Sequence, residues 1–133
     1  MHISPTPEAI AAFAQRGLSG PIRMLNLLRF RETADYSASP DLAPGEPISG
    51  AEAYEIYSTL TIPLLTEVGG RAIFMGTGGQ LLIGPSEARW DQVLIIEYPD
   101  VAAFGAMTQD PRYHAGAGHR TAALADSRLL PMQ

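Results

Sequence analysis

The sequence predicts one α+β domain, in which a four-stranded antiparallel sheet carries helices on one face and an extra helix precedes the first strand. The length of 133 residues suits one domain better than two. Strand-like runs and capped helical patterns follow one another in the order strand, helix, two strands, helix, strand. Two of the strand-like runs are apolar on both alternating faces, which is typical of strands covered on both sides.

The composition excludes several kinds of site. The chain has no cysteine, so it cannot form disulfides, thiolate zinc sites or a cysteine nucleophile. All nine basic residues are arginine, which excludes lysine Schiff-base chemistry and suggests a GC-rich bacterial genome. The net charge of −5 argues against binding to nucleic acid, which requires clustered positive charge. No apolar run approaches the roughly 20 residues of a membrane span, so we expect a cytoplasmic protein that binds neither nucleic acid nor membrane.

The first 19 residues are expected to form a helical extension in front of the main domain, which comprises residues 20–133. Thr6 supplies a capping hydroxyl, and Pro7 suits the first position of a helix. These two signals predict a short helix that ends at about Arg16.

A long loop separates the first predicted strand from the first long helix. Residues 22–30 (IRMLNLLRF) predict a buried strand, whereas residues 32–49 contain three prolines and no periodicity. The loop is either functional or a surface excursion. Ser49 and Glu52 match a capping box that begins a helix, inside which Pro63 predicts a kink or a break. The apolar residues of this helix form one stripe: Ala53, Tyr57, Leu60, Leu64 and Val68.

Glycines divide the middle of the chain. Residues 71–75 and 81–83 are short strand-like runs on either side of Gly76–Gly79. The glycines form either a hairpin turn or a bend in one long strand. Residues 90–98 then give the clearest strand pattern of the chain, and their apolar continuity predicts a central position in the sheet.

Two capped helices and a strand complete the predicted domain. Asp100 caps a helix that runs to about Thr108, and Asp110 followed by proline begins another. Residues 126–130 predict a final strand. Apart from the leading helix, this is the order of a ferredoxin-like βαββαβ unit.

Helices on one face leave the other face of the sheet to be explained. The alternation places Leu25 and Leu27 on one face of the first strand and Val93 and Ile95 on one face of the strand 90–98. An exposed apolar sheet face of this extent is a liability in a soluble monomer. We therefore expect a homodimer that pairs the two sheet faces.

Several motifs follow one another in order along the chain: Trp90, Glu97, Tyr98, Pro99, Asp110, Pro111, Tyr113, Arg120, Asp126, Ser127 and Arg128. Gly69-Gly70-Arg71 precedes them. With these motifs the chain resembles the domain of unknown function 1330 family over about residues 21–132. The resemblance implies a ferredoxin-like chain that assembles as a dimeric α+β barrel. It implies no reaction, since barrels of this fold include monooxygenases, isomerases and haem-binding proteins.

Polar side chains inside apolar strands are the first candidates for a site. Asn26 and Arg29 are expected to bind substrate, because buried polar groups need partners. The alternatives are a structural hydrogen bond for Asn26 and a salt bridge at the strand end for Arg29. Tyr54 lies off the main helical stripe and is expected to face a pocket, whereas Tyr57 is expected to pack with its hydroxyl satisfied.

Two titratable side chains are candidates for catalysis. Glu97 ends an apolar strand, where burial would suit a general acid or base, and the alternative is an ion pair with Arg71, which is also a candidate to bind substrate. His114 is a candidate general acid. His119 follows five residues later, about 140° around a helix, which does not suit joint metal ligation. We expect neither a metal nor a bound cofactor.

Two hypotheses for the function follow from these residues. In the first, the protein binds a small apolar or aromatic molecule between sheet and helices, and acts as a cofactor-independent oxidoreductase or isomerase. In the second, it is a non-catalytic binding or structural homodimer. The two hypotheses differ in whether the polar side chains converge on one cavity.

Overall fold

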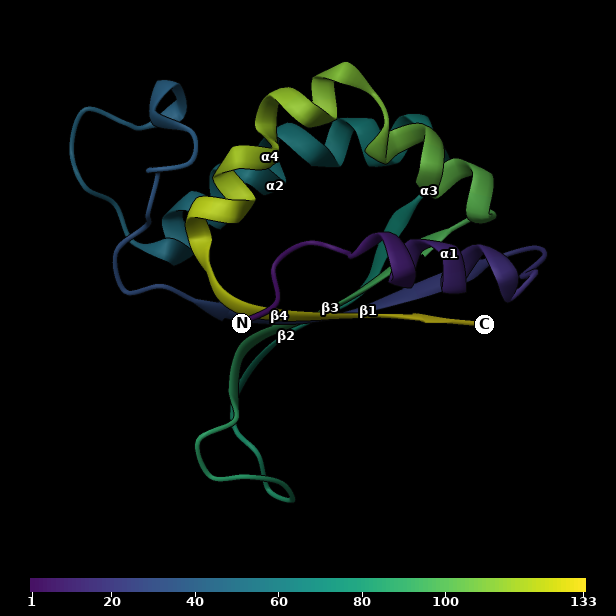
Figure 1. Ribbon diagram of the computed structural model, residues 1–133, viewed down its shortest axis with the longest axis horizontal. Coiled ribbons are helices and arrows are strands. Elements are labelled where there is room, and N and C mark those ends of the chain that lie inside the picture. The colour runs from purple at the N-terminus through teal and green to yellow at the C-terminus, as the bar shows by residue number, and fades with distance from the viewer.

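The computed structural model describes residues 1–133 as one antiparallel sheet with helices on one face (Figure 1). The strand order is β2-β3-β1-β4, and each neighbouring pair is antiparallel. The predicted ferredoxin-like order, with an extra N-terminal helix, is confirmed. The elements are α1 (Pro7–Gln15), β1 (Ile22–Phe30), the 3-10 turn η1 (Pro40–Leu42), α2 (Gly50–Glu67), β2 (Arg71–Gln80), β3 (Arg89–Tyr98), α3 (Val101–Thr108), α4 (Pro111–Ala123) and β4 (Leu124–Met132).

The helices begin where the capping residues predict. The Thr6 hydroxyl accepts a hydrogen bond from the amide of Ala9, and Ser49 and Glu52 form the reciprocal capping box at the start of α2. The carboxylates of Asp100 and Asp110 likewise accept hydrogen bonds from amides in the first turns of α3 and α4. These local hydrogen bonds satisfy amide groups that the first turn of a helix leaves unpaired.

Helix α2 differs from its sequence prediction in two respects. It is unbroken from Gly50 to Glu67, so, of the kink or break expected at Pro63, the break is wrong. Pro63 is exposed, and water can therefore bond the carbonyl that the proline leaves free, while the next two residues are buried in the core. The helical stripe predicts that Leu60 faces the core, but Leu60 is half-exposed, whereas Tyr54, which lies off that stripe, is buried.

The glycine-rich segment forms one long strand rather than a hairpin turn. Strand β2 continues through Gly76–Gly79, with a register irregularity between Ala72 and Phe74. The strand predicted at residues 81–83 is wrong, because these residues lie in the connection to β3 and pair with no strand. Figure 1 shows the end of this hairpin projecting away from the sheet on the side opposite the helices.

The core lies between the helices and the sheet and consists of two apolar clusters. The first cluster is centred on Leu28, Tyr54 and Tyr57, and the second on Met24 and Leu65. Ile96 and Tyr113 pack against both clusters. Only 18 of the 133 residues are buried, and none of them lies on the face of the sheet that points away from the helices. The protomer therefore leaves one sheet face without a cover.

Candidate functional site

The uncovered face of the sheet carries an apolar row that crosses all four strands. Phe74 on β2 pairs with Ile95 on β3, Ile95 pairs with Leu25 on β1, and Leu25 pairs with Leu130 on β4. Val93 and Leu27 form a second, shorter row beside it. We call the residues of these two rows the outer face.

Charged side chains border the outer face. Glu97 pairs in register with Arg23 and Arg71, and both guanidinium groups bond its carboxylate, at 3.0 Å and 3.1 Å. The sequence alternative of a Glu97–Arg71 ion pair is therefore correct, and Arg23 is a second partner. At the other end of the face, the guanidinium groups of Arg29 and Arg128 lie over the ring of Trp90. An apolar centre with a charged rim is the usual anatomy of a protein–protein interface.

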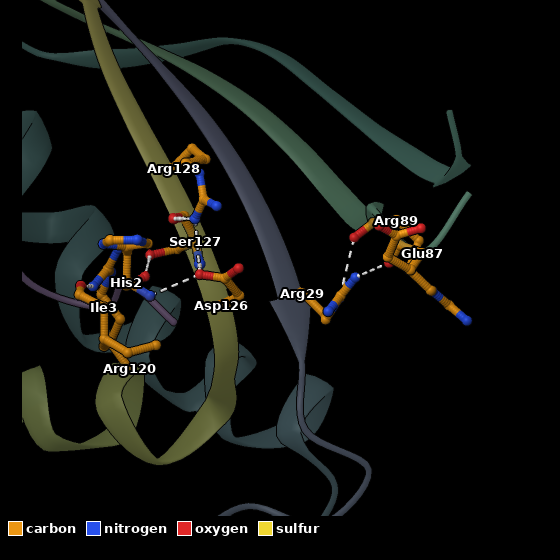
Figure 2. A network of polar contacts seen from close by, with 9 residues as sticks. All are labelled: His2, Ile3, Arg29, Glu87, Arg89, Arg120, Asp126, Ser127 and Arg128. Atoms are coloured by element: carbon orange, nitrogen blue, oxygen red, sulfur yellow. Dashed lines mark hydrogen bonds and ion pairs between the residues drawn. The ribbon is translucent and has the colours of Figure 1, made fainter. Parts of the chain in front are cut away.

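Arg29 also fixes the hairpin that follows β2. Its guanidinium donates to the carbonyl of Glu87 at 2.6 Å and to the carbonyl of Arg89 at 3.2 Å (Figure 2). A carboxylate partner at the strand end was the alternative expected for Arg29, but the side chain bonds main-chain carbonyls instead. An open depression of about 500 Å³ lies beside it, lined mainly by charged residues at the base of the hairpin.

On the helix-facing side, polar groups gather where the two core clusters meet. The hydroxyls of Tyr57 on α2 and Tyr113 on α4 lie 3.0 Å apart and share a hydrogen bond. Asn26 lies on β1 between Met24 of one cluster and Leu28 of the other, and its amide donates to the Met24 carbonyl at 3.1 Å. We call Asn26, Tyr57, Ile96 and Tyr113 the polar seam.

Burial raises the pKa values of the tyrosines around the seam. Desolvation raises the pKa of Tyr54 to about 12, although the positive charge of Arg120 lowers this pKa in part. Desolvation raises the pKa of Tyr57 still further. Desolvation also raises the pKa of Tyr98, with Tyr113 and Tyr54 contributing. At neutral pH these hydroxyls are hydrogen-bond donors and acceptors, not bases.

The N-terminal residues are held beside Arg120. Arg120 donates to the Ile3 carbonyl at 2.6 Å, the Ser127 hydroxyl donates to the His2 carbonyl at 2.6 Å, and the His2 amide donates to the Asp126 carboxylate at 2.7 Å (Figure 2). Ile3 also packs against the first core cluster. The segment therefore covers the end of the core where β4 follows α4.

The pKa of Asp126 predicts when this N-terminal contact is lost. Burial alone would raise the pKa of Asp126, but hydrogen bonds from His2, Arg128 and Ser127 outweigh it and lower the pKa to about 2. The contact should therefore be fully present above the ordinary aspartate pKa of about 3.9 and lost as the pH falls through about 2. A titration of the His2 amide chemical shift should show a midpoint near 2. A midpoint near 4 would contradict this assignment.

The histidines of α4 lie in different environments. His119 is buried, and its Nδ1 lies 2.7 Å from the Tyr36 hydroxyl; desolvation lowers its pKa. His114 is exposed on the next turn toward the N-terminus of the helix. No group of three or more His, Asp or Glu side chains is positioned to hold one metal ion.

The six side chains proposed from the sequence do not converge on one cavity. Glu97, Arg71 and Arg29 lie around the outer face, Asn26 and Tyr54 lie on the helix-facing side, and His114 is exposed on α4. Sequence reasoning missed Tyr113 and Arg120 as members of a site. Both were part of the family resemblance, but the hydroxyl partner of Tyr113 is 56 residues away, so only the fold brings the pair together.

Comparison with solved structures defines the class as ferredoxin-like α+β proteins. A dimeric ferredoxin-like protein of unknown function from Jannaschia sp. is 14% identical, with a TM-score of 0.55 over 86% of this chain and 99% of the other. SnoaB, a cofactor-independent oxygenase from Streptomyces nogalater, is 13% identical, with a TM-score of 0.52 over 86% of this chain and 93% of SnoaB. At these identities the similarity extends to the fold alone.

The chain belongs to the family described as Domain of unknown function (DUF1330), whose model matches residues 47–131. Two structures of RPA0582, a protein of unknown function from Rhodopseudomonas palustris, are 42% identical to it. The first has a TM-score of 0.89, and the match covers 99% of this chain and 93% of that protein. The second has a TM-score of 0.85, and the match covers 98% of this chain and 95% of that protein. Comparison with curated protein sequences gives no match. None of the helices is long and apolar enough to cross a membrane.

Proposed function

We propose that the protein is a homodimer that binds a small organic molecule, largely apolar or aromatic with one hydrogen-bond acceptor, at the polar seam. The observation that carries this proposal is the Tyr57–Tyr113 hydroxyl pair at the junction of two apolar clusters. Ligand sites are usually apolar concavities with a few placed polar groups. Residues 1–19 act in this proposal as an added cover at the end of the core beside Arg120.

The outer face supports the homodimer. Its apolar rows run from edge to edge of the sheet, and a two-fold axis would place each row against its own copy. The charged residues at the margins would form the rim. Similar folds from Jannaschia sp. and Bacteroides fragilis are described as dimeric, which agrees with this use of the sheet.

The chemistry of the seam supports a ligand with an acceptor oxygen. The two hydroxyls carry two protons and use one of them in their shared hydrogen bond, which leaves one O–H able to donate. That hydroxyl is neutral at neutral pH, because the ordinary tyrosine pKa is about 10 and burial raises the pKa of Tyr57 further. Tyr54 and Phe30, whose ring centroids lie 5.5 Å apart, add aromatic surface nearby. A cofactor-independent oxidoreductase or isomerase would be a narrower form of this proposal.

A structural homodimer without a ligand is the second candidate. It is favoured by the separation of the two candidate catalytic residues. Glu97 is held by two arginines beside the outer face, whereas His114 is exposed on α4, over the opposite face of the sheet. The two side chains cannot act together on one substrate from these positions.

Ligand-observed NMR with 2-acetylnaphthalene tests the binding proposal. This probe joins an aromatic surface to one carbonyl acceptor. We expect saturation transfer with the native protein and about 5-fold weaker binding after Tyr57→Phe, since one hydrogen bond contributes about 1 kcal/mol. Tyr36→Phe is the matched control, because the Tyr36 hydroxyl bonds His119 outside the seam. No binding by either protein would favour the structural dimer, whereas equal binding by the native protein and Tyr57→Phe would contradict the polar seam as the binding site.

A further inference from the structure

The hairpin between β2 and β3 carries apolar side chains that find no partner in the protomer. We call residues 76–90 the arm. At its tip, Leu82 is 98% exposed and Ile83 is 92% exposed. Residues 72–86 contain no charged side chain. Adjacent, fully exposed aliphatic side chains on an uncharged β-hairpin are an aggregation hazard unless another surface covers them.

The arm projects on the side of the sheet where the proposed partner would lie. Figure 1 shows it leaving the sheet away from the helices, and the outer face points in the same direction. Phe74, which is 53% exposed, belongs to the apolar row and lies two residues before the arm begins. The apolar row therefore reaches the start of the arm, and the segment Gly76–Gln80, which has no apolar side chain, separates it from the apolar tip.

The base of the arm is fixed, although its tip is free. Arg29 bonds the carbonyls of Glu87 and Arg89 (Figure 2). In addition, the Gln80 amide donates to the Ser86 carbonyl at 3.3 Å. A Cβ atom at Gly78 would overlap the carbonyl of Trp90, so the two strands of the arm approach closely there. The direction of the arm is thus set by the protomer before it meets a partner.

We propose that each arm packs against the second copy of this chain, with the tip residues Leu81–Ile83 buried on the partner. This inference rests on the proposed homodimer. The sheet order puts the arm at one edge and the exposed Leu130 of β4 at the other. A two-fold axis along the strands would bring each β2 edge over the partner's β4 edge. Arg29 then acts as a positioning residue that aims the arm.

A second copy suits the arm better than a lipid surface does. The chain carries a net charge of −5, and residues 72–86, which include the tip of the arm, contain no basic side chain. Cytoplasmic membrane surfaces are negatively charged and attract basic segments. A binding test with lipid vesicles distinguishes a second copy of the chain from a lipid surface as the partner of the tip.

Photo-crosslinking from the tip tests the proposal directly. Because the chain has no cysteine, Leu82→Cys provides one site for a benzophenone-maleimide label. We expect illumination to give a covalent dimer joined through the arm. Ile62→Cys on α2, which is 55% exposed, is the matched control and should give none. Absence of a dimer band from Leu82→Cys, or an equal band from the control, would overturn the proposal.

Charged substitutions at the tip test the role of the arm separately from the role of the outer face. We expect Leu82→Asp with Ile83→Asp to raise the dimer dissociation constant about 10- to 100-fold in sedimentation experiments. A native dimer whose dissociation constant the double variant leaves unchanged would refute the arm but leave the homodimer standing. A native monomer would refute both. Binding of the native protein to phosphatidylserine vesicles, lost in the double variant while the dimer is unchanged, would assign the tip to a membrane instead.

Discussion

Replacement of Leu25 by glutamate is expected to separate the proposed homodimer into folded monomers. Leu25 is the central β1 residue of the apolar row, between Ile95 and Leu130. Each dimer would contain two introduced carboxylates, which the interface would have to strip of water without supplying partners. We expect the dimer dissociation constant to rise at least about 100-fold, as for the loss of about 3 kcal/mol.

Sedimentation velocity together with circular dichroism measures both parts of this prediction. Leu25 is partly exposed in the protomer, so the monomer should keep its helical and strand signals. Ile62→Glu introduces the same charge on the exposed side of α2 and should leave the dimer intact. If Leu25→Glu sediments as the native protein does, the outer face is not the interface.

Gly50→Val is expected to produce the largest loss of stability. An added Cβ would overlap the carbonyls of Arg31 and Ala123 and the amide nitrogen of Arg31. These are main-chain atoms, which cannot move aside as a flexible side chain can. The same atoms form two hydrogen bonds, from the Gly50 amide to Arg31 at 2.9 Å and from the Arg31 amide to Ala123 at 2.8 Å. Position 50 thus joins the start of α2 to the ends of β1 and α4.

Urea denaturation should show the free energy of unfolding falling by about 3 kcal/mol or more in Gly50→Val. That is a large part of the 5–15 kcal/mol typical of a domain. Gly45→Ala is the control, because a Cβ there meets no atom within 4 Å. A native-like denaturation midpoint for Gly50→Val would contradict the close packing described at this junction.

The elements whose signals are local could be predicted from the sequence. Thr6, Ser49, Asp100 and Asp110 each hold the first turn of their own helix, and the signal for this lies within three residues. The alternation of β1 likewise fixes which residues face the helices, because the side-chain period of a strand is two. The register between neighbouring strands is known only once the structure shows which residues pair.

The candidate site could be predicted only in part. The ion pair of Glu97 with Arg71 was foreseeable, because both residues lie at the ends of neighbouring strands. The Tyr57–Tyr113 pair was not, since each tyrosine also fits the ordinary pattern of a packed helix residue. Residues 81–83 look like a strand because strand propensity does not reveal whether a pairing partner is present.

Native mass spectrometry of the protein purified without added ligand tests the central claim most directly. The proposed homodimer predicts a species of twice 14.2 kDa. An additional small mass bound to that dimer would support the ligand site at the polar seam and give the mass of its occupant. A species of 14.2 kDa alone would contradict the pairing of the outer faces, and with it the role proposed for the arm.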